Sequence, residues 1–275
     1  MRGERSFKPS GIVTLTTDFG HRDPFVGVMK GRILERFPDA RIVDLTHEIE
    51  RFTPAEAGFW LERSFAYFPT GTVHVAVVDP GVGTSRGIVC VSARGHVFLA
   101  PDNGLLARLV RRHEVEGMVR LKDAALKNLG IDRPSATFHG RDIFAPVAAE
   151  IASGRRTVDQ LGEPVEALLP SSIPEPAVRA GSVTGAIVTI DHFGNLISNI
   201  EVELIAPLRH PQVRIGGRSL GLSRTYGDAA AGEYLALVNS FGVVEVARSE
   251  GSASAGLGLA RGAPIEVLDS PPGDS

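Results

Sequence analysis

Apolar runs that alternate with amphipathic helical segments constrain the fold of this chain more than any other feature. The clearest run is 72–79 (TVHVAVVD), and similar runs recur within the first 100 residues. Between them, apolar side chains such as Val26, Met29 and Ile33 return at the spacing of one helix face. A strand that is apolar throughout is buried on both faces, so helices must cover both sides of the sheet. The sequence therefore predicts an N-terminal α/β domain with a largely parallel sheet flanked by helices.

Two proline-containing stretches mark expected helix starts. Asp23 and Pro24 are typical of the N-cap and first turn of a helix. The stretch 53–56 (TPAE) has the spacing of a capping box, in which Thr53 and Glu56 each satisfy a backbone N–H. We expect helices to begin at both places.

The character of the chain changes near residue 167. The stretch 168–181 (LLPSSIPEPAVRAG) is rich in proline and serine and has no period, so it predicts a linker. Short β segments separated by turns follow it at even spacing, which predicts a small all-β barrel or sandwich. We therefore expect an α/β domain over 1–167, a linker over 168–181 and a β domain over 182–275.

Composition and charge exclude several classes of protein. A net charge of −3 offers no basic field for nucleic acid or anionic lipid. The single cysteine, Cys90, excludes a disulfide framework, and its apolar strand indicates a core position. The eight histidines show no metal-ligand spacing, so we expect no metal site. No apolar run reaches 18 residues, and the first ten residues lack the apolar core of a secretion signal, so we expect a cytoplasmic protein without membrane or nucleic-acid partners.

Two strand ends of the α/β part carry polar residues suited to a site, because sites on open sheets lie beyond the carboxyl ends of strands. Asp18 follows the first strand in TTDFG, where its carboxylate can accept two hydrogen bonds from a diol or cap its own turn. The loop 79–86 (DPGVGTSR) begins as a dinucleotide fingerprint, but Arg86 stands where the third glycine belongs. We expect this loop to present Asp79 and Arg86 together, as a site or as a structural ion pair.

Other polar segments are ambiguous when each is taken alone. His139 stands directly before a helix in FHGRDIFAP, where a histidine is more often a turn residue than a catalyst. In the β part, the stretches 191–199 (DHFGNLISN), 239–242 (NSFG) and 247–256 (ARSEGSASAG) have the composition of hairpin turns. Their joint presence is less easily explained by turns.

Taken together, these segments resemble one family, the S-adenosyl-L-methionine (SAM) hydroxide adenosyltransferases, which are relatives of the SAM-dependent fluorinase and chlorinase. Seven stretches match in order: TTDFG, VDLTHEI, DPGVGTSR, APDNGLL, FHGRDIFAPVAA, IDHFGN and NSFGVVEVA. The resemblance covers most of the chain from about residue 12 to 268. Members of the family cleave SAM at its 5′ carbon with water or hydroxide and release adenosine and methionine. The resemblance therefore implies a SAM hydrolase that needs no cofactor, since SAM is the substrate.

The resemblance assigns catalysis to Asp79, Arg86 and His139. Fluorinase-type members replace the motif aspartate with tyrosine, lack this histidine and carry an extra loop. This sequence keeps both residues and shows no long insertion, which favours hydroxide over halide. The resemblance also implies a homotrimer, with each site between the α/β domain of one subunit and the β domain of its neighbour.

The resemblance assigns the remaining contacts by part of the substrate. Asp18 is expected to hold the ribose hydroxyls, beside the aromatic face of Phe52, which replaces a tryptophan of the fluorinase branch. Asp191 is expected on the methionine ammonium, and Ser240 on the methionine carboxylate.

For the adenine, the resemblance implies four contacts. Phe193 is expected against the ring and Asn195 on its edge. Tyr226 is expected to stack on the ring, and the backbone near Ala253 to read its edge.

The chemistry limits how such a site can work. Methionine leaves as a neutral thioether and needs no general acid, so the nucleophile is the difficult partner. Lowering the pKa of water from about 15.7 to 7 without a metal would need about 12 kcal/mol. Positioning the water in line with the reacting carbon is worth about 7–11 kcal/mol. We expect this positioning to contribute more than the lowering of the water's pKa that one arginine can supply.

On this chemistry, we expect Arg86 and the sulfonium to stabilise hydroxide character. Asp79 is expected to orient Arg86 and the water, and His139 to orient the water or to accept its proton through a relay. The alternatives are a SAM-dependent halogenase, a non-enzymatic SAM or adenosine sensor and, less well supported, a metal-dependent phosphohydrolase.

Overall fold

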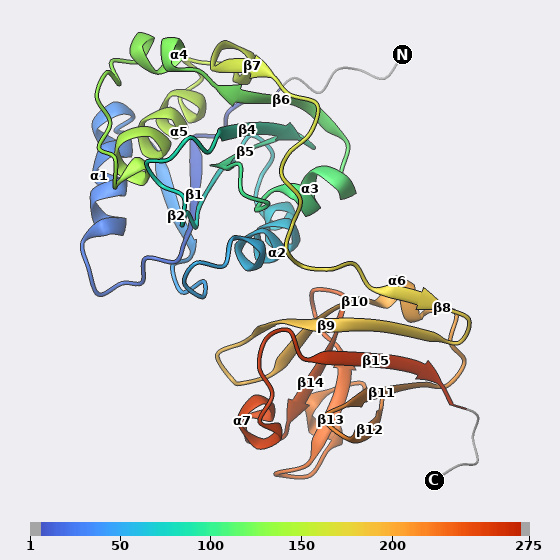
Figure 1. Ribbon diagram of the computed structural model, residues 1–275. Helices are drawn as coiled ribbons and strands as arrows, with labels where there is room; N and C mark the ends of the chain where they lie inside the picture. The colour runs from blue at the N-terminus through green and yellow to red at the C-terminus, as the bar shows by residue number, and fades with distance from the viewer. Residues whose placement is uncertain (1–6, 271–275) are drawn as a thin grey trace. The chain divides into compact units, whose positions relative to one another are not determined.

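Strands that run in one direction alternate with helices through the first part of the structure, a computed structural model that describes residues 7–270 (Figure 1). The chain divides into two units, one up to Ser172 and one from Ile173. The first is an α/β unit and the second a curled antiparallel sheet, so the predicted fold class is confirmed.

The first unit is built on a seven-stranded sheet in the order β2-β1-β3-β5-β4-β6-β7. Its strands are β1 (Ile12–Thr17), β2 (Arg41–Thr46), β3 (Val73–Val77), β4 (Ile88–Ala93), β5 (His96–Pro101), β6 (Val115–Leu121) and β7 (Gly162–Pro164). The pairs β1–β2, β1–β3 and β3–β5 are parallel, whereas β4 runs antiparallel to both β5 and β6. Five strands therefore point the same way, and β4 and β7 oppose them.

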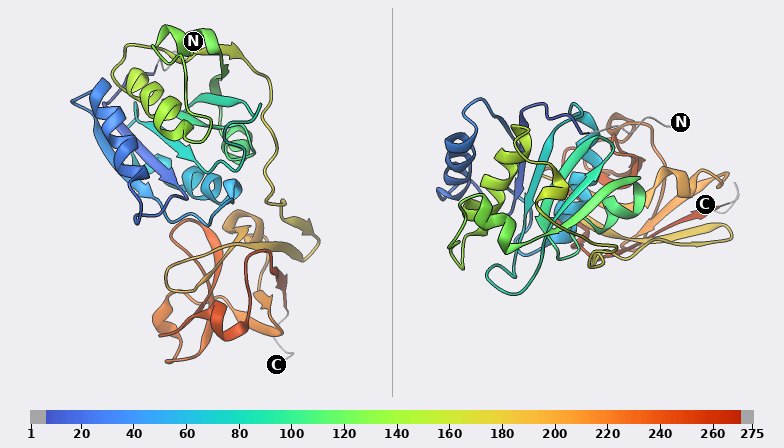
Figure 2. Two further views of the ribbon diagram at one scale, coloured as in Figure 1. Left: turned by 60° about the vertical axis from the view of Figure 1, so that its left-hand side comes forward. Right: turned by 90° about the horizontal axis from the view of Figure 1, so that it is seen from above.

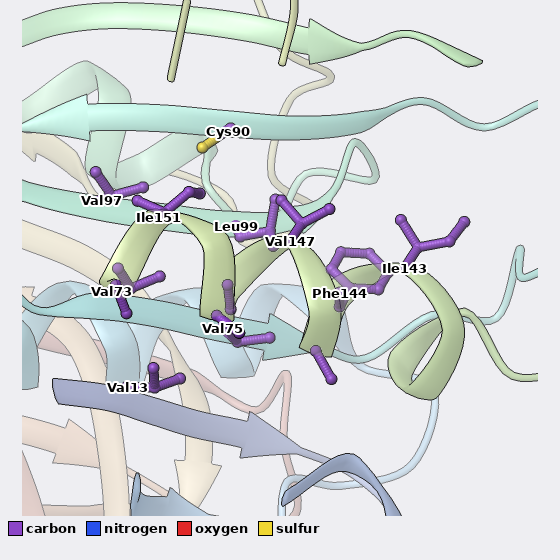
Figure 3. Close-up of a cluster of buried hydrophobic side chains, with 14 of the residues drawn as sticks. Val13, Val73, Val75, Cys90, Val97, Leu99, Ile143, Phe144, Val147 and Ile151 are labelled. Carbon is purple, nitrogen blue, oxygen red and sulfur yellow. The ribbon is translucent and has the colours of Figure 1, made fainter. Parts of the chain in front are cut away.

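Helices cover both faces of this sheet, as its continuously apolar strands require. They are α1 (Phe25–Arg36), α2 (Pro54–Ser64), α3 (Ala107–Arg112), α4 (Asp123–Asn128) and α5 (Ala145–Ala152), with short turns η1 (Phe65–Tyr67), η2 (Gly140–Phe144) and η3 (Val158–Gln160). In Figure 1, α1 and α5 lie on one side of the strands and α2 and α3 on the other. Figure 3 shows Phe144, Val147 and Ile151 packed over the side chains of β3 and β5.

Both expected helix starts differ in detail from the prediction. Helix α1 begins at Phe25 with Pro24 at its N-cap, and Asp23 provides no cap hydrogen bond. Helix α2 begins at Pro54 as expected, but the capping box is wrong. The Thr53 hydroxyl donates to the carbonyl of Arg51, and the carboxylate of Glu56 accepts from the N–H of Glu50. The cause is local, because Thr53 has φ −119° and ψ 75° and so turns its hydroxyl away from the first helical N–H groups.

The second unit is an antiparallel sheet in the order β12-β11-β15-β9-β10-β14-β13, and Figure 2 shows its curvature in two further views. Its strands are β8 (Ala177–Arg179), β9 (Ser182–Ile190), β10 (Leu196–Glu201), β11 (Pro211–Ile215), β12 (Arg218–Gly221), β13 (Tyr234–Val238), β14 (Val243–Arg248) and β15 (Pro264–Asp269). A bridge between Leu222 and Ala236 brings the two end strands together, so the sheet nearly closes into a barrel. Three short helices complete the unit: α6 (Val202–Ile205), η4 (Tyr226–Asp228) and α7 (Ala253–Leu257).

Two local features of this unit depart from the predicted pattern. Strand β10 ends at Glu201, and the residues directly after it form the short helix α6. Strand β8 lies inside the stretch expected to be a linker and pairs with β9. No helix among residues 7–270 is both long enough and apolar enough to cross a membrane.

Candidate functional site

The carboxyl ends of β1 and β3 place two acidic residues at the same edge of the first sheet. The two strands are parallel neighbours in which Thr17 pairs with Val77, so Asp18 and Asp79 leave the sheet close together. A pocket of about 280 Å³ opens there. It is lined by Asp18, Phe19, Phe25, Arg51, Phe52, Val77, Asp79, Val82, Thr137, Phe138, His139 and Gly140. Four residues expected in the site therefore share one pocket within the first unit.

Arg86 connects two residues of this pocket. Its Nε lies 3.0 and 2.9 Å from the two carboxylate oxygens of Asp79, and its Nη2 donates to the same carboxylate. The same Nη2 lies 2.8 Å from Nδ1 of His139. Both members of the ion pair are almost fully buried, with 10% and 4% of the Arg86 and Asp79 side chains exposed. The three expected catalytic residues thus form one hydrogen-bonded chain.

The contact with Arg86 fixes the proton on His139. A guanidinium can only donate, so Nδ1 of His139 must be the acceptor, and the proton of the neutral ring is on Nε2. Partial burial and the charge of Arg86 lower the pKa of His139, which keeps the ring neutral near pH 7. His139 therefore has a hydrogen-bond donor on its remaining nitrogen.

A close backbone approach and one side-chain hydrogen bond hold the loops that carry Asp79, Arg86 and His139. Gly83 has φ +77°, and a Cβ at this position would overlap the carbonyl oxygen of Ala136, so only glycine permits the loops to approach. The side-chain amide of Asn103 donates to the carbonyl of Val78, directly before Asp79, over 2.9 Å. Asn103 belongs to the APDNGLL motif, which therefore supports the Asp79 loop from the neighbouring strand end.

Asp18 is bonded to another segment of the pocket. Its Oδ2 accepts the backbone N–H of Phe52 over 3.0 Å, and Phe52 has the unusual φ of +63°. Burial raises the pKa of Asp18, an effect opposed by this hydrogen bond. Phe52 is 73% exposed, so Asp18 fixes an aromatic residue that little else covers within this unit. The carboxylate of Asp18 thus organises a neighbouring loop, whereas the turn interpretation expected it to cap its own turn.

Three further aromatic rings form the apolar wall of the pocket. Phe19, Phe25 and Phe138 contact one another edge to face, with centroids 5.4 to 6.0 Å apart. The end of β1, directly before Asp18 and Phe19, is held by the buried His47, whose Nδ1 lies 2.8 Å from the Thr17 hydroxyl. None of these four residues was expected in the site, although Phe19, His47 and Phe138 lie inside the TTDFG, VDLTHEI and FHGRD motifs.

The second unit carries the other expected residues. Asp191 and Asn195 form a turn, as one interpretation of DHFGN expected. Oδ1 of Asp191 accepts hydrogen bonds from the backbone N–H groups of Phe193 and Asn195. Its Oδ2 accepts one from the Asn195 side-chain amide over 2.9 Å. Helix α7 adjoins this turn, since the N–H of Ser254, next to Ala253, donates to the carbonyl of Gly194.

The remaining three side chains of this unit are exposed. Phe193 is 74% exposed and Tyr226 is 49% exposed. Ser240 is exposed in the turn between β13 and β14. Large aromatic surfaces of this kind are typical of ligand or partner contacts rather than of a core.

Glu245, which was not predicted from the sequence, connects the segment of Tyr226 with the NSFG turn. Glu245 on β14 is 2% exposed and accepts hydrogen bonds from the Tyr226 hydroxyl, over 2.7 Å, and from the Asn239 side-chain amide, over 3.0 Å. The available signal was a single charged residue in the otherwise apolar run GVVEVA.

Two side-chain types associated with other chemistries lie elsewhere. Cys90 is fully buried in β4, and burial raises the pKa of its thiol, as expected for a core residue. Among residues 7–270, no group of three or more His, Cys, Asp or Glu side chains is arranged to hold a metal ion.

Comparison with known proteins links both units to one family. The profile of the SAM hydroxide adenosyltransferase N-terminal domain matches residues 13–162, and that of the C-terminal domain matches residues 185–266. An (R)-S-adenosyl-L-methionine hydrolase of Thermus thermophilus is 39% identical over 93% of this chain and 99% of its own. A protein of the same name from Salinispora tropica is 38% identical over 94% of this chain and 98% of its own.

More distant similarities extend the comparison. A fluorinase of Actinopolyspora mzabensis is 26% identical over 94% of this chain and 97% of its own. The crystal structure of an uncharacterised conserved protein from Thermotoga maritima superposes with a TM-score of 0.84 at 34% identity, covering 94% of this chain and 99% of that one.

Proposed function

The chain belongs to the SAM hydroxide adenosyltransferase family, and we propose that it hydrolyses SAM to adenosine and L-methionine. The resemblance drawn from its motifs is thereby confirmed. One observation within the molecule carries the proposal: Arg86 is bonded at once to Asp79 and His139, which line the same pocket as Asp18.

The reaction is a displacement at the 5′ carbon of the ribose. The oxygen of water forms a bond to C5′ while the C5′–S bond breaks, and the electron pair of that bond stays on sulfur as the neutral thioether of methionine. One proton of the water is released, and the sulfonium charge is lost. Because the leaving group is neutral, the protein has only to position the water and accommodate its developing hydroxide character.

The geometry divides these tasks among the three bonded residues. The Nε2–H of His139 donates to the water oxygen and orients one of its lone pairs. The Asp79 carboxylate, which lines the same pocket, accepts a hydrogen bond from the water and then its proton. Arg86 holds both partners and offsets the charge of Asp79, so that the carboxylate does not repel the forming hydroxide. His139 is then an orienting donor rather than the base.

The family resemblance supplies the proposed substrate contacts. Asp18 offers its remaining lone pairs to the ribose hydroxyls, and the exposed face of Phe52 covers the sugar. On the second unit, Asp191 receives the methionine ammonium and Ser240 the carboxylate. Phe193, Asn195, Tyr226 and the backbone at Ala253 receive the adenine.

Water is favoured over halide as the nucleophile. The polar chain of Asp79, Arg86 and His139 offers both a donor to the water oxygen and an acceptor for its proton, whereas a halide needs no acceptor. The hydrolase relatives are also more similar to this chain than the fluorinases, at 38–39% against 26% identity. Chloride or fluoride added to the assay should therefore give no halogenated nucleoside.

The test is to incubate the protein with SAM in water enriched in oxygen-18 and to analyse the products by chromatography and mass spectrometry. We expect equimolar adenosine and methionine, with the heavy oxygen in the 5′ hydroxyl of adenosine. Failure to form adenosine would refute the proposal and favour a SAM or adenosine sensor. Activity that disappears with EDTA would contradict the expectation that no metal takes part.

Assembly and location remain predictions. We propose a homotrimer, on the basis of the family resemblance, and light scattering after gel filtration tests it. We also propose a cytoplasmic location, which fractionation of the source cells would test.

A further inference from the structure

Glu245 is a buried carboxylate that the contacts assigned above do not use. It lies on β14, opposite Ile197 of β10 and Leu237 of β13, on the barrel face that also carries the buried Leu235 and Ala247. Only 2% of it is exposed, yet both of its hydrogen-bond partners in the described part of the chain are neutral. Burial, followed by the charge of Asp191, raises the pKa of Glu245, so holding this carboxylate here has a cost.

The two partners of Glu245 lie in separate segments of the chain. Tyr226 is in the short helix η4, and its hydroxyl donates to Oε1. Asn239 directly follows β13, and its side-chain nitrogen donates to Oε2. The side-chain oxygen of Asn239 accepts the N–H groups of Phe241 over 3.0 Å and Val243 over 3.3 Å, and so shapes the turn that holds Ser240.

From these contacts we infer that Glu245 is a positioning residue for the methionine end of SAM. By accepting from the side-chain nitrogen of Asn239, it determines that the oxygen of this amide faces the turn, and thereby sets the position of Ser240. Its second oxygen holds Tyr226 against the same face. The inference rests on the proposed function, because it takes Ser240 as a contact of the substrate carboxylate.

A reversal of the hydrogen bond tests this role directly. Asn239→Asp sets a second carboxylate against Glu245, which repels it and displaces the turn. Adding Glu245→Gln to this variant restores the hydrogen bond in the opposite direction, because the glutamine amide now donates to the carboxylate at position 239. That carboxylate can still accept hydrogen bonds from the two backbone N–H groups of the turn. Glu245→Gln alone keeps both bonds, since its amide can accept from Asn239 and donate to the Tyr226 oxygen.

We expect Asn239→Asp to raise KM for SAM about tenfold, which corresponds to about 1.4 kcal/mol, with kcat within about threefold of wild type. The double variant should return KM to within about threefold, and Glu245→Gln alone should stay in that range. Binding should weaken equally for S-adenosylhomocysteine, which carries the amino-acid group, but not for methylthioadenosine, which lacks it.

Three results would overturn the inference: a wild-type KM in Asn239→Asp, a double variant as impaired as Asn239→Asp, or an equal loss for methylthioadenosine. Melting temperatures of all variants separate misfolding from a displaced turn. A wild-type protein that forms no adenosine would instead refute the proposed function, so the two failures are distinguishable.

Discussion

The proton position on His139 yields the sharpest test of the proposed division of roles. If the ring acts through its Nε2–H, a residue with a donor at that position should replace it. Glutamine places its amide nitrogen near the imidazole Nε2, whereas asparagine reaches only to the position of Nδ1. We therefore expect His139→Gln to retain much of the rate and His139→Asn to lose it.

The size of the effect follows from the number of contacts removed. Loss of one oriented donor at a reacting oxygen lowers kcat by about 10²–10³, or about 2.7–4 kcal/mol. His139→Ala and His139→Asn should show this full loss, and His139→Gln should stay within about tenfold of wild type. KM for SAM should change little in all three, because His139 contacts the water rather than the substrate.

The pH dependence provides an independent readout in the same assay. Protonation of His139 would place a hydrogen on Nδ1, opposite the Arg86 donor, and break the chain. Since the pKa of His139 is lowered, the wild-type rate should be constant around pH 7 and fall only below about pH 6.5. His139→Gln has no such group, so this acid limb should disappear. Equal losses in the glutamine and asparagine variants would refute the donor role and favour a base.

Three other perturbations test separate parts of the account. Asp18→Asn should raise KM for SAM at least tenfold with a small change in kcat, because it weakens the hold on the ribose and on the Phe52 loop; an unchanged KM would contradict this. Gly83→Ala should lower kcat at least tenfold without unfolding the protein, because the added Cβ would overlap the carbonyl of Ala136. Circular dichroism is the control for folding, and a wild-type kcat would contradict the role given to Gly83. Burial lowers the pKa of His74 to about 3, so the unfolded state binds the extra proton below pH 6.5 and stability declines as the pH falls from there towards 3. Urea unfolding should show a loss of about 2 kcal/mol from this residue between pH 7 and 5, and His74→Asn should remove it; identical slopes in both proteins would count against this.

Much of the first unit could be predicted because its signals are local and repeated. Apolar strands that alternate with amphipathic helices specify a covered sheet, and the strand-end rule then locates Asp18 and Asp79 at one edge. The helices after Asp23 and Thr53 were predicted, but their side-chain caps were not predicted correctly, because a cap depends on the φ and ψ of a single residue that composition does not reveal.

The parts of the site that escaped prediction depend on pairing between distant segments. Glu245 stands alone in an apolar strand, and nothing in its neighbours reveals the Tyr226 hydroxyl 19 residues earlier. Likewise, the support that Asn103 provides to the Asp79 loop follows from sheet order, since β4 and β5 form a hairpin whose second strand pairs with β3. Turn residues such as Asp191 fit two interpretations at once, because one carboxylate can cap a turn and still present a lone pair.

The most direct test of the central claim is the rate of adenosine formation in a single turnover by Arg86→Ala, with the dissociation constant for SAM measured on the same protein. Arg86 joins Asp79 to His139, so its loss should lower the rate at least 100-fold while SAM binds within a few-fold of wild type. Because Asp79 would then be buried without its cation, a melting curve must show that the variant is folded at the assay temperature. A folded Arg86→Ala protein that forms adenosine at the wild-type rate would contradict the account.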